Sequence, residues 1–232
     1  MDQSTKPIEV YVEAGSKRTF AGAIEWPGWC RSGRDELLSL ERLFAYAPRY
    51  AKALASIQIA FPEPADLSRF TVVERLKGNA TTDFGAPAIA PSADARPLDE
   101  PELHRLEGIL TGCWGALDAA AKTAEGKELA KGPRGGGRDL HQIVEHAMEA
   151  ETAYLSRLGW NATQQPREDS LEPGKSRDLI LSALRAAAHG EIPQRGPRGA
   201  ALWTPRYFVR RVAWHALDHA WEIEDRVIAS TS

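Results

Sequence analysis

The amino-acid sequence predicts an α+β protein in which a small N-terminal ββαβ unit precedes a four-helix bundle. Residues 8–12 alternate apolar and polar side chains, which is the period of a half-buried β-strand. Beyond residue 100, four segments repeat apolar residues every three or four positions, which is the period of an amphipathic helix. We therefore expect three parts: residues 1–77 for the ββαβ unit, 78–100 for a linker or extended segment, and 101–232 for the bundle.

The N-terminal unit is expected to open with a β-hairpin. Pro27 and Gly28 end the second strand, since proline cannot donate to a sheet and glycine favours a turn. Asp35 is placed to cap the helix that follows, because its carboxylate can accept from free N–H groups of the first turn. The expected elements are a strand over 8–12, a turn over 15–18, a strand over 19–26, a helix over 36–59 and a strand over 70–76.

The second half of the chain is expected to form four helices. Asp139 and Ser176 are candidate caps for the second and third helices, and Thr204 followed by Pro205 is a favourable start for the fourth. A long polar stretch over residues 159–175 separates the second helix from the third, which predicts a bundle with one crossover connection. The expected helices cover residues 102–123, 139–158, 176–190 and 204–229.

Composition and charge favour a globular protein and argue against a nucleic-acid-binding or membrane protein. The 232 residues are 43% hydrophobic and 26% charged, as in an ordinary globular protein, and the net charge of −3 argues against nucleic-acid binding. No apolar run is long enough for a membrane span, and residues 1–6 lack the apolar core of a signal peptide. The two cysteines, Cys30 and Cys113, lie far apart in the sequence, and we expect both to be free thiols. We expect a cytoplasmic protein with a small-molecule substrate, no nucleic-acid or membrane partner, and a homodimer as one option for its assembly.

The most informative feature is a pair of histidines, His215 and His219, inside the fourth expected helix. A spacing of four residues puts both imidazoles on one helix face, one turn apart, where they can bind the same divalent metal ion. The pair lacks the HExxH glutamate between its histidines, so the zinc-protease helix is not indicated. The alternative is that both are buried histidines bonded to neighbouring carboxylates.

The second expected helix supplies a candidate third ligand. On a helical wheel His146 borders the apolar stripe of its helix, whereas His141 lies about 140° away from His146, on the opposite side from that stripe. The spacing therefore favours His146 as the inward-facing residue and His141 as a surface residue. Three imidazoles from two helices can bind a metal ion and leave positions open for water or substrate, as catalytic sites do.

The part of the chain that contains these two helices, about residues 98–230, resembles the DinB-like (DinB/YfiT-like) superfamily of metal-binding proteins. The matching residues are Asp139 and Leu140, the segment 146–151 (HAMEAE), Tyr154 with Leu155, and the segment 210–219 (RRVAWHALDH). Members of that superfamily are four-helix bundles in which one histidine of the second helix and an HxxxH pair of the fourth bind a divalent metal ion. The resemblance implies His146, His215 and His219 as the metal ligands, with zinc or nickel as the expected ion.

The resemblance also implies a class of reaction. The superfamily includes transferases and isomerases that use low-molecular-weight thiols, and a branch of metal-dependent hydrolases. A bound ion lowers the pKa of a thiol or a water and so presents a nucleophile at neutral pH. We therefore expect a metal-dependent thiol transferase or a hydrolase, with a low-molecular-weight thiol as a possible second cofactor. The alternative is a non-enzymatic interaction or sensor protein with a structural or vestigial metal site.

Glu222, three residues after His219, is the candidate catalytic helper, as a general base or as the carboxylate that orients a ligand histidine. Glu149 has the same spacing from His146, but an ordinary charged residue on the helix surface explains it equally well. Whether Cys30, Cys113 or Glu149 takes part is left open by the sequence.

The N-terminal unit, over about residues 8–76, resembles the HicB-like antitoxin fold. The resemblance depends on residues 26–33 (WPGWCRSG) and on the helix expected after Asp35. Trp29 interrupts the Pro-Gly-Cys segment of that family, and no DNA-binding module follows. We expect a docking or dimerisation role for this unit and carry over neither DNA binding nor toxin neutralisation.

Overall fold

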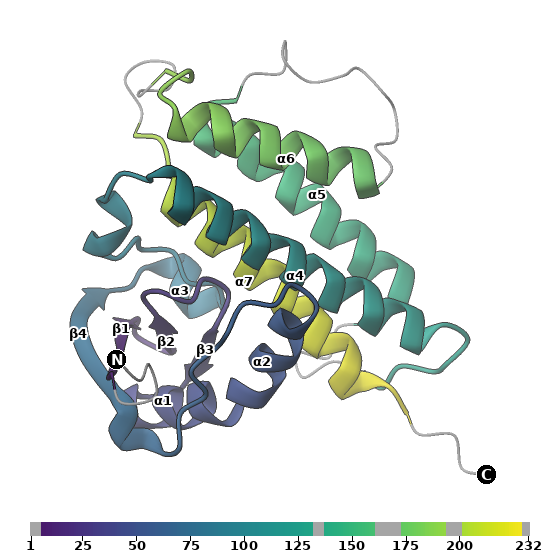
Figure 1. Ribbon diagram of the computed structural model, residues 1–232. Coiled ribbons are helices and arrows are strands. Elements are labelled where there is room, and N and C mark those ends of the chain that lie inside the picture. Colours follow the sequence, from purple (N-terminus) through teal and green to yellow (C-terminus); the bar gives the residue numbers. More distant parts are fainter. Residues whose placement is uncertain (1–5, 132–136, 161–172, 194–200, 229–232) are drawn as a thin grey trace.

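The structure, a computed structural model, is a mixed α+β fold that describes residues 6–131, 137–160, 173–193 and 201–228 (Figure 1). An N-terminal sheet has the strand order β3-β2-β1-β4, and only the β1–β4 pair is parallel. Val10 in β1 lies opposite Ala23 on one side and Val72 on the other. The predicted α+β class is confirmed. The strands are β1 (Ile8–Ala14), β2 (Thr19–Ala23), β3 (Cys30–Gly33) and β4 (Phe70–Lys77).

The sheet has one strand more than the ββαβ prediction, because β3 was not expected. The second strand also ends at Ala23 instead of Trp26. A tight turn follows in which Trp29 donates its backbone N–H to the carbonyl of Trp26, and Gly28 has a φ of +92°, a left-handed conformation that favours glycine. This turn sends the four residues of β3 back along β2. A strand this short has too few positions to show alternation in the sequence.

The expected helix over 36–59 is two helices, α1 (Glu36–Ala45) and α2 (Ala47–Ala55). Asp35 caps α1 as predicted, since its carboxylate accepts the N–H of Leu38 at 2.8 Å. The break falls at Tyr46, two residues before Pro48. Proline has no N–H to continue the α1 hydrogen-bond ladder and is tolerated only in a first helical turn, which is its place in α2.

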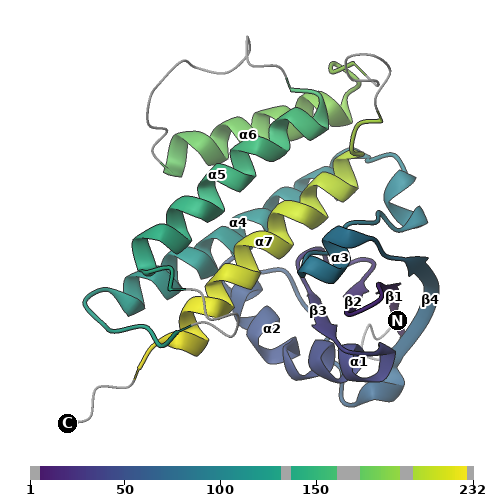
Figure 2. The ribbon, with the colours of Figure 1, turned by 180° about the vertical axis from the view of Figure 1, so that it is seen from behind.

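Four long helices make up the rest of the structure (Figures 1 and 2). Asp139 and Thr204 cap the second and fourth of them, as expected. Ser176 is not a cap, because the third helix already includes Pro173 and the Ser176 hydroxyl is buried inside the fold. Among the described residues, no helix combines the length and the apolar character needed to cross a membrane. The helices are α4 (Glu100–Ala124), α5 (Leu140–Leu158), α6 (Pro173–Ala188) and α7 (Pro205–Arg226).

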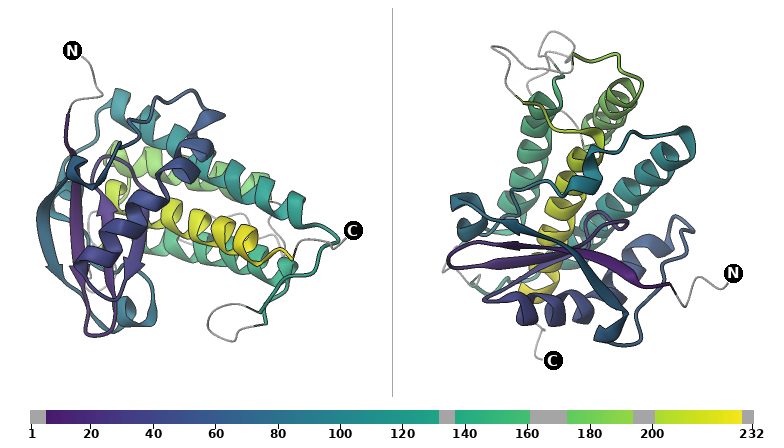
Figure 3. Two further views of the ribbon diagram at one scale, coloured as in Figure 1. Left: turned by 90° about the horizontal axis from the view of Figure 1, so that it is seen from below. Right: turned by 90° about the vertical axis from the view of Figure 1, so that its left-hand side faces the viewer.

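Helix α7 lies between the sheet and the other long helices. Figure 3 shows α1 on one side of the sheet and the long helices on the other. Phe20 of β2 and Cys30 of β3 form a small cluster with Trp214 of α7, and the two rings meet edge-on at 6.2 Å. The main apolar cluster includes residues of the sheet, of α1 and α2, and of all four long helices. One continuous core therefore connects the N-terminal sheet to the helices.

The segment expected as a linker, residues 78–100, contains a short helix α3 (Ala80–Phe84) and a 3₁₀ turn over Ser92–Ala95. Asp94 in that turn is buried and pairs with Arg210 of α7 at 2.6 Å. Arg210 also donates to the backbone carbonyls of Ala23 and Ile24 at the end of β2. This guanidinium therefore fixes α7, the sheet and the 78–100 segment to one another.

Removing the carboxylate of Asp94 should destabilise the whole fold. The variant Asp94→Ala leaves the Arg210 cation buried without its partner, so we expect a loss of about 3–5 kcal/mol in the free energy of unfolding. Chemical denaturation measures it. Asp118→Ala, which breaks the ion pair of an exposed aspartate with Arg177, is the matched control and should cost about 1 kcal/mol or less. Equal effects of the two substitutions would contradict this account.

Candidate metal centre

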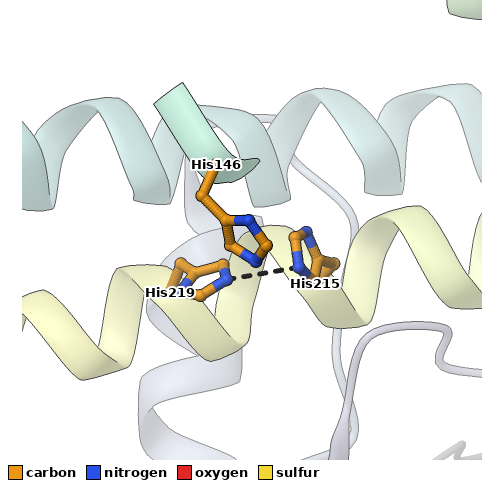
Figure 4. Close-up of side chains that lie close together, drawn as sticks. All are labelled: His146, His215 and His219. Carbon is orange, nitrogen blue, oxygen red and sulfur yellow. Dashed lines mark hydrogen bonds between the residues drawn. The ribbon is translucent and has the colours of Figure 1, made fainter. Parts of the chain in front are cut away.

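Helices α5 and α7 bring three histidines together, and Figure 4 shows their rings facing one another. His146 comes from α5, and His215 and His219 come from α7. A nitrogen of each ring lies within 4.8 Å of a nitrogen of the other two. The two Nε2 atoms of the α7 pair are 3.2 Å apart. All three histidines singled out from the sequence therefore meet at one point, and this cluster can hold a metal ion.

Helix periodicity accounts for this meeting. His215 and His219 are one turn apart, with ring centroids 4.5 Å from each other. His146 faces both, with its ring centroid 5.3 Å from that of His215 and 5.2 Å from that of His219. His141 is on the far side of α5, with 85% of its side chain exposed and its Nδ1 atom 3.8 Å from the carboxylate of Glu145. The wheel argument that separated His146 from His141 is consistent with these positions.

Glu222 holds one of the three histidines, His219, in a fixed orientation. Its carboxylate lies 2.9 Å from Nδ1 of His219, and the hydrogen bond from His219 lowers the pKa of Glu222. An ionised carboxylate at Nδ1 requires that this nitrogen bear the proton, so the lone pair of Nε2 faces the other histidines. Arg226 donates to the second oxygen of Glu222 at 2.8 Å. Glu222 is thus held from two sides as a positioning residue.

Burial favours the neutral form of His146 and His215. Loss of contact with water lowers the pKa of His215 well below its ordinary range, and the nearby His219, His146 and Arg211 lower it further. Burial also lowers the pKa of His146, with Arg138 and His219 acting in the same direction. A neutral imidazole is the form that binds a metal ion. His146 and His215 would therefore need no deprotonation to bind an ion at pH 7.

The donor set fits a divalent ion such as zinc. Zinc binds imidazole nitrogen at about 2.0–2.1 Å, which places two nitrogens of a tetrahedral site about 3.3 Å apart. The 3.2 Å between the Nε2 atoms of His215 and His219 agrees with that spacing. Within the described part of the chain the cluster contains these three residues and no fourth histidine, cysteine or carboxylate.

The remaining candidates from the sequence lie elsewhere. The side chain of Glu149 is exposed. Cys30 and Cys113 are buried free thiols. Burial raises the pKa of Cys30 to about 12, although a hydrogen bond from Tyr11 opposes this, and burial raises that of Cys113 as well. A thiol held in its protonated form is a small apolar side chain rather than a ligand or a nucleophile.

Sequence reasoning missed the part of the site that lies beyond the histidines. Arg211 precedes His215 by four residues, so one face of α7 presents a row of polar side chains, which we call the α7 polar row. Tyr154 of α5 packs edge-on against His215 at 5.9 Å and accepts a hydrogen bond from Arg211 at 3.2 Å. The four-residue spacing of Arg211 from His215 was the available signal. The α7 polar row consists of Arg211, His215, His219, Glu222 and Arg226.

Glu151 is another buried titratable residue, and it lies outside the histidine cluster. It is five residues from His146 on α5 and its side chain points toward α4, where Trp114 donates to it at 3.0 Å. Burial raises the pKa of Glu151 to about 7, although the Trp114 hydrogen bond opposes the shift. Its carboxyl group therefore affects the stability of the fold and not the chemistry of the histidines.

The chain was compared with models of protein families, with curated proteins and with solved structures. None of the three comparisons finds a match. The likeness to DinB-like and HicB-like proteins therefore continues to depend on the short motifs quoted above.

The raised pKa of Glu151 predicts a dependence of stability on pH. The folded state binds the proton more tightly than the unfolded state, whose carboxyl titrates near 4.5. The contribution of this group to stability is therefore most favourable below that value and is lost as the pH rises through about 7. Glu151→Gln should remove the loss and stabilise the protein at pH 8 by about 3 kcal/mol.

Urea unfolding of both proteins between pH 4.5 and 8 measures this effect as the difference between the two curves. Glu145→Gln, an exposed substitution on the same helix, should follow the wild-type curve. A constant difference between Glu151→Gln and wild type across that range would show that Glu151 does not titrate there.

Proposed function

We propose that this chain is a DinB-like metal-binding protein in which His146, His215 and His219 hold one divalent ion, zinc or nickel. The observation that supports this most directly is the convergence of three buried or half-buried imidazoles, with two facing nitrogens 3.2 Å apart. The order of the long helices, with one histidine on α5 and an HxxxH pair on α7, agrees with the bundle that such proteins share.

The proposed activity is that of a metal-dependent enzyme acting through a low-molecular-weight thiol or a water, of the transferase, isomerase or hydrolase type. When bound, the ion supplies the acidity that makes a thiol or water nucleophilic at pH 7. The chain contributes three nitrogen donors, and Glu222 is already engaged by His219 and Arg226. Because the described residues add no fourth donor, coordination positions are left for a substrate.

A non-enzymatic sensor or interaction protein is the alternative. A structural zinc site is normally closed by four protein ligands, whereas a catalytic site keeps a position for an exchangeable molecule. The three-donor set found in the described residues favours the enzyme. The N-terminal sheet would then act as a docking or dimerisation unit, as its likeness to HicB-like folds suggests.

Metal analysis tests the proposed site. Purified wild-type protein should carry about one equivalent of zinc or nickel, and each of His146→Ala, His215→Ala and His219→Ala should lose most of it, since two nitrogen ligands hold such an ion weakly. Elemental analysis after dialysis gives the stoichiometry. His141→Ala, a change on the exposed side of α5, is the matched control and should retain the metal.

A wild-type protein without stoichiometric metal would overturn the site, as would full retention in His215→Ala. Replacing the bound metal with cobalt distinguishes the enzyme from the structural or sensor protein. An added thiol changes the visible spectrum of protein-bound cobalt only where a coordination position is exchangeable. A spectrum that no added thiol alters would favour the structural or sensor role.

Glu222→Gln should weaken metal binding without abolishing it. An amide cannot match the charge-assisted hydrogen bond that now fixes the orientation of His219, so the dissociation constant for zinc should rise about 10- to 100-fold. Competition with a chromophoric chelator measures this constant. Glu145→Gln, a change of the same kind at an exposed position of α5, should leave it unchanged, and equal affinities in all three proteins would refute a positioning role for Glu222.

A further inference from the structure

Three arginines of α7 are buried, and they differ in what neutralises them. Arg210, Arg211 and Arg226 expose between 4% and 6% of their surface. Arg210 pairs with Asp94, and Arg226 pairs with Glu222. Within the described part of the chain, Arg211 donates to the backbone carbonyl of Pro87 and to the Tyr154 hydroxyl, both uncharged. Among the residues that the structure describes, no carboxylate forms an ion pair with Arg211.

The unpaired charge is unusual because of where it lies. A cation taken out of water needs an anion or a full set of hydrogen bonds in return, and Arg211 has neither, since its Nε is buried without a partner. Nε1 of Trp214 and Nδ1 of His215 are also buried without partners. Three unpartnered nitrogens thus fall within five residues of α7, at the end of the α7 polar row that includes the metal ligands.

Other arginines of this protein show what fits the free edge of Arg211. Arg210 binds Asp94 through Nε and Nη2, and Arg75 binds Glu36 through the same two atoms, in each case with two parallel hydrogen bonds. On Arg211 that edge has an unpartnered Nε, while Nη2 makes one bond of 3.2 Å to Tyr154. A carboxylate is the group whose charge and two oxygens match this edge.

Aromatic rings fix the guanidinium in place. The Cζ atom of Arg211 lies 4.9 Å from the ring centre of Trp214, 5.5 Å from that of Tyr154 and 5.9 Å from that of Trp203. Tyr154 also contacts the ring of His215. Tyr154 and Trp203 are partly exposed, so this end of the site is in contact with solvent. Because Tyr154 contacts both Arg211 and His215, a molecule bound at the histidines lies near Arg211.

We propose that Arg211 binds a carboxylate group of the molecule that occupies the open positions of the metal centre. The substrate class is then a small carboxylic acid whose second functional group, a thiol or another metal-binding donor, lies within one helical turn of the carboxylate. Arg211 selects the substrate and orients it, and takes no part in the chemical step. This inference rests on the proposed function, since it requires that His146, His215 and His219 hold the ion.

The test compares two thiols that differ in a carboxylate, 3-mercaptopropionate and 2-mercaptoethanol, as ligands of the cobalt-substituted protein. Their dissociation constants are measured from the thiolate-to-cobalt absorption. Wild type should prefer the carboxylate-bearing thiol about tenfold or more, the difference that a charge-assisted pair of hydrogen bonds provides. Arg211→Gln should abolish the preference while its affinity for 2-mercaptoethanol stays within about twofold of wild type.

Arg185→Gln is the matched control, because it removes the same charge from an exposed position on α6. It should keep the preference of the wild type. If Arg211→Gln does not fold, as judged by circular dichroism, Arg211→Lys replaces it. Lysine keeps the charge but loses the two-donor edge, so the preference should fall at least about threefold.

An undiminished preference in a folded Arg211 variant that still binds cobalt would overturn this inference and leave the proposed function intact. A wild-type protein that binds no metal would overturn the proposed function instead. Propionate titrated into that metal-free protein, followed by tryptophan fluorescence, then decides the role of Arg211. Saturable binding that Arg211→Gln abolishes would support a carboxylate site, and no binding by wild type would refute it.

Discussion

The enclosure of α7 is the constraint on which the rest of the structure depends. The sheet covers one side of this helix and the other long helices cover the rest, so most of its residues are buried. The buried polar side chains of such a helix must find their hydrogen-bond partners among its neighbours. Arg210 and Arg226 have such partners. The exceptions in α7 among the described residues, Arg211, Trp214 and His215, lie beside the histidine cluster, which is why we interpret them as a binding site instead of a packing defect.

Local signals in the sequence predicted much of the architecture and the histidine cluster. Helix starts at Asp35, Asp139 and Thr204 were recognisable because a cap depends on residues only three positions away. The separation of His146 from His141 was equally local, since the angle between two residues of one helix follows from their spacing alone. The break at Pro48 was also visible in the sequence, and the prediction of one helix over 36–59 gave it too little weight.

Contacts between distant segments were beyond such reasoning. Strand β3 exists because a turn places four residues against β2, and its own sequence carries no period. Asp94 stood in a stretch rich in alanine and proline that read as a linker, and its partner Arg210 lies 116 residues further along the chain. Arg211 and Tyr154 are 57 residues apart on different helices. A buried charge reveals its role only when the fold shows what surrounds it.

The hydrogen bonds of Arg226 connect the histidine cluster to the backbone at Ala130 and Arg138. Its guanidinium binds Glu222, which binds His219, and it also donates to the carbonyls of Ala130 and Arg138 on either side of the glycine-rich stretch between α4 and α5. A change of charge at His219 therefore alters the field at both ends of that stretch. Thermodynamic linkage is reciprocal, so whatever fixes or displaces those carbonyls must in turn change the affinity at the histidines. The histidine cluster and the backbone at Ala130 and Arg138 are thus joined by one continuous chain of hydrogen bonds.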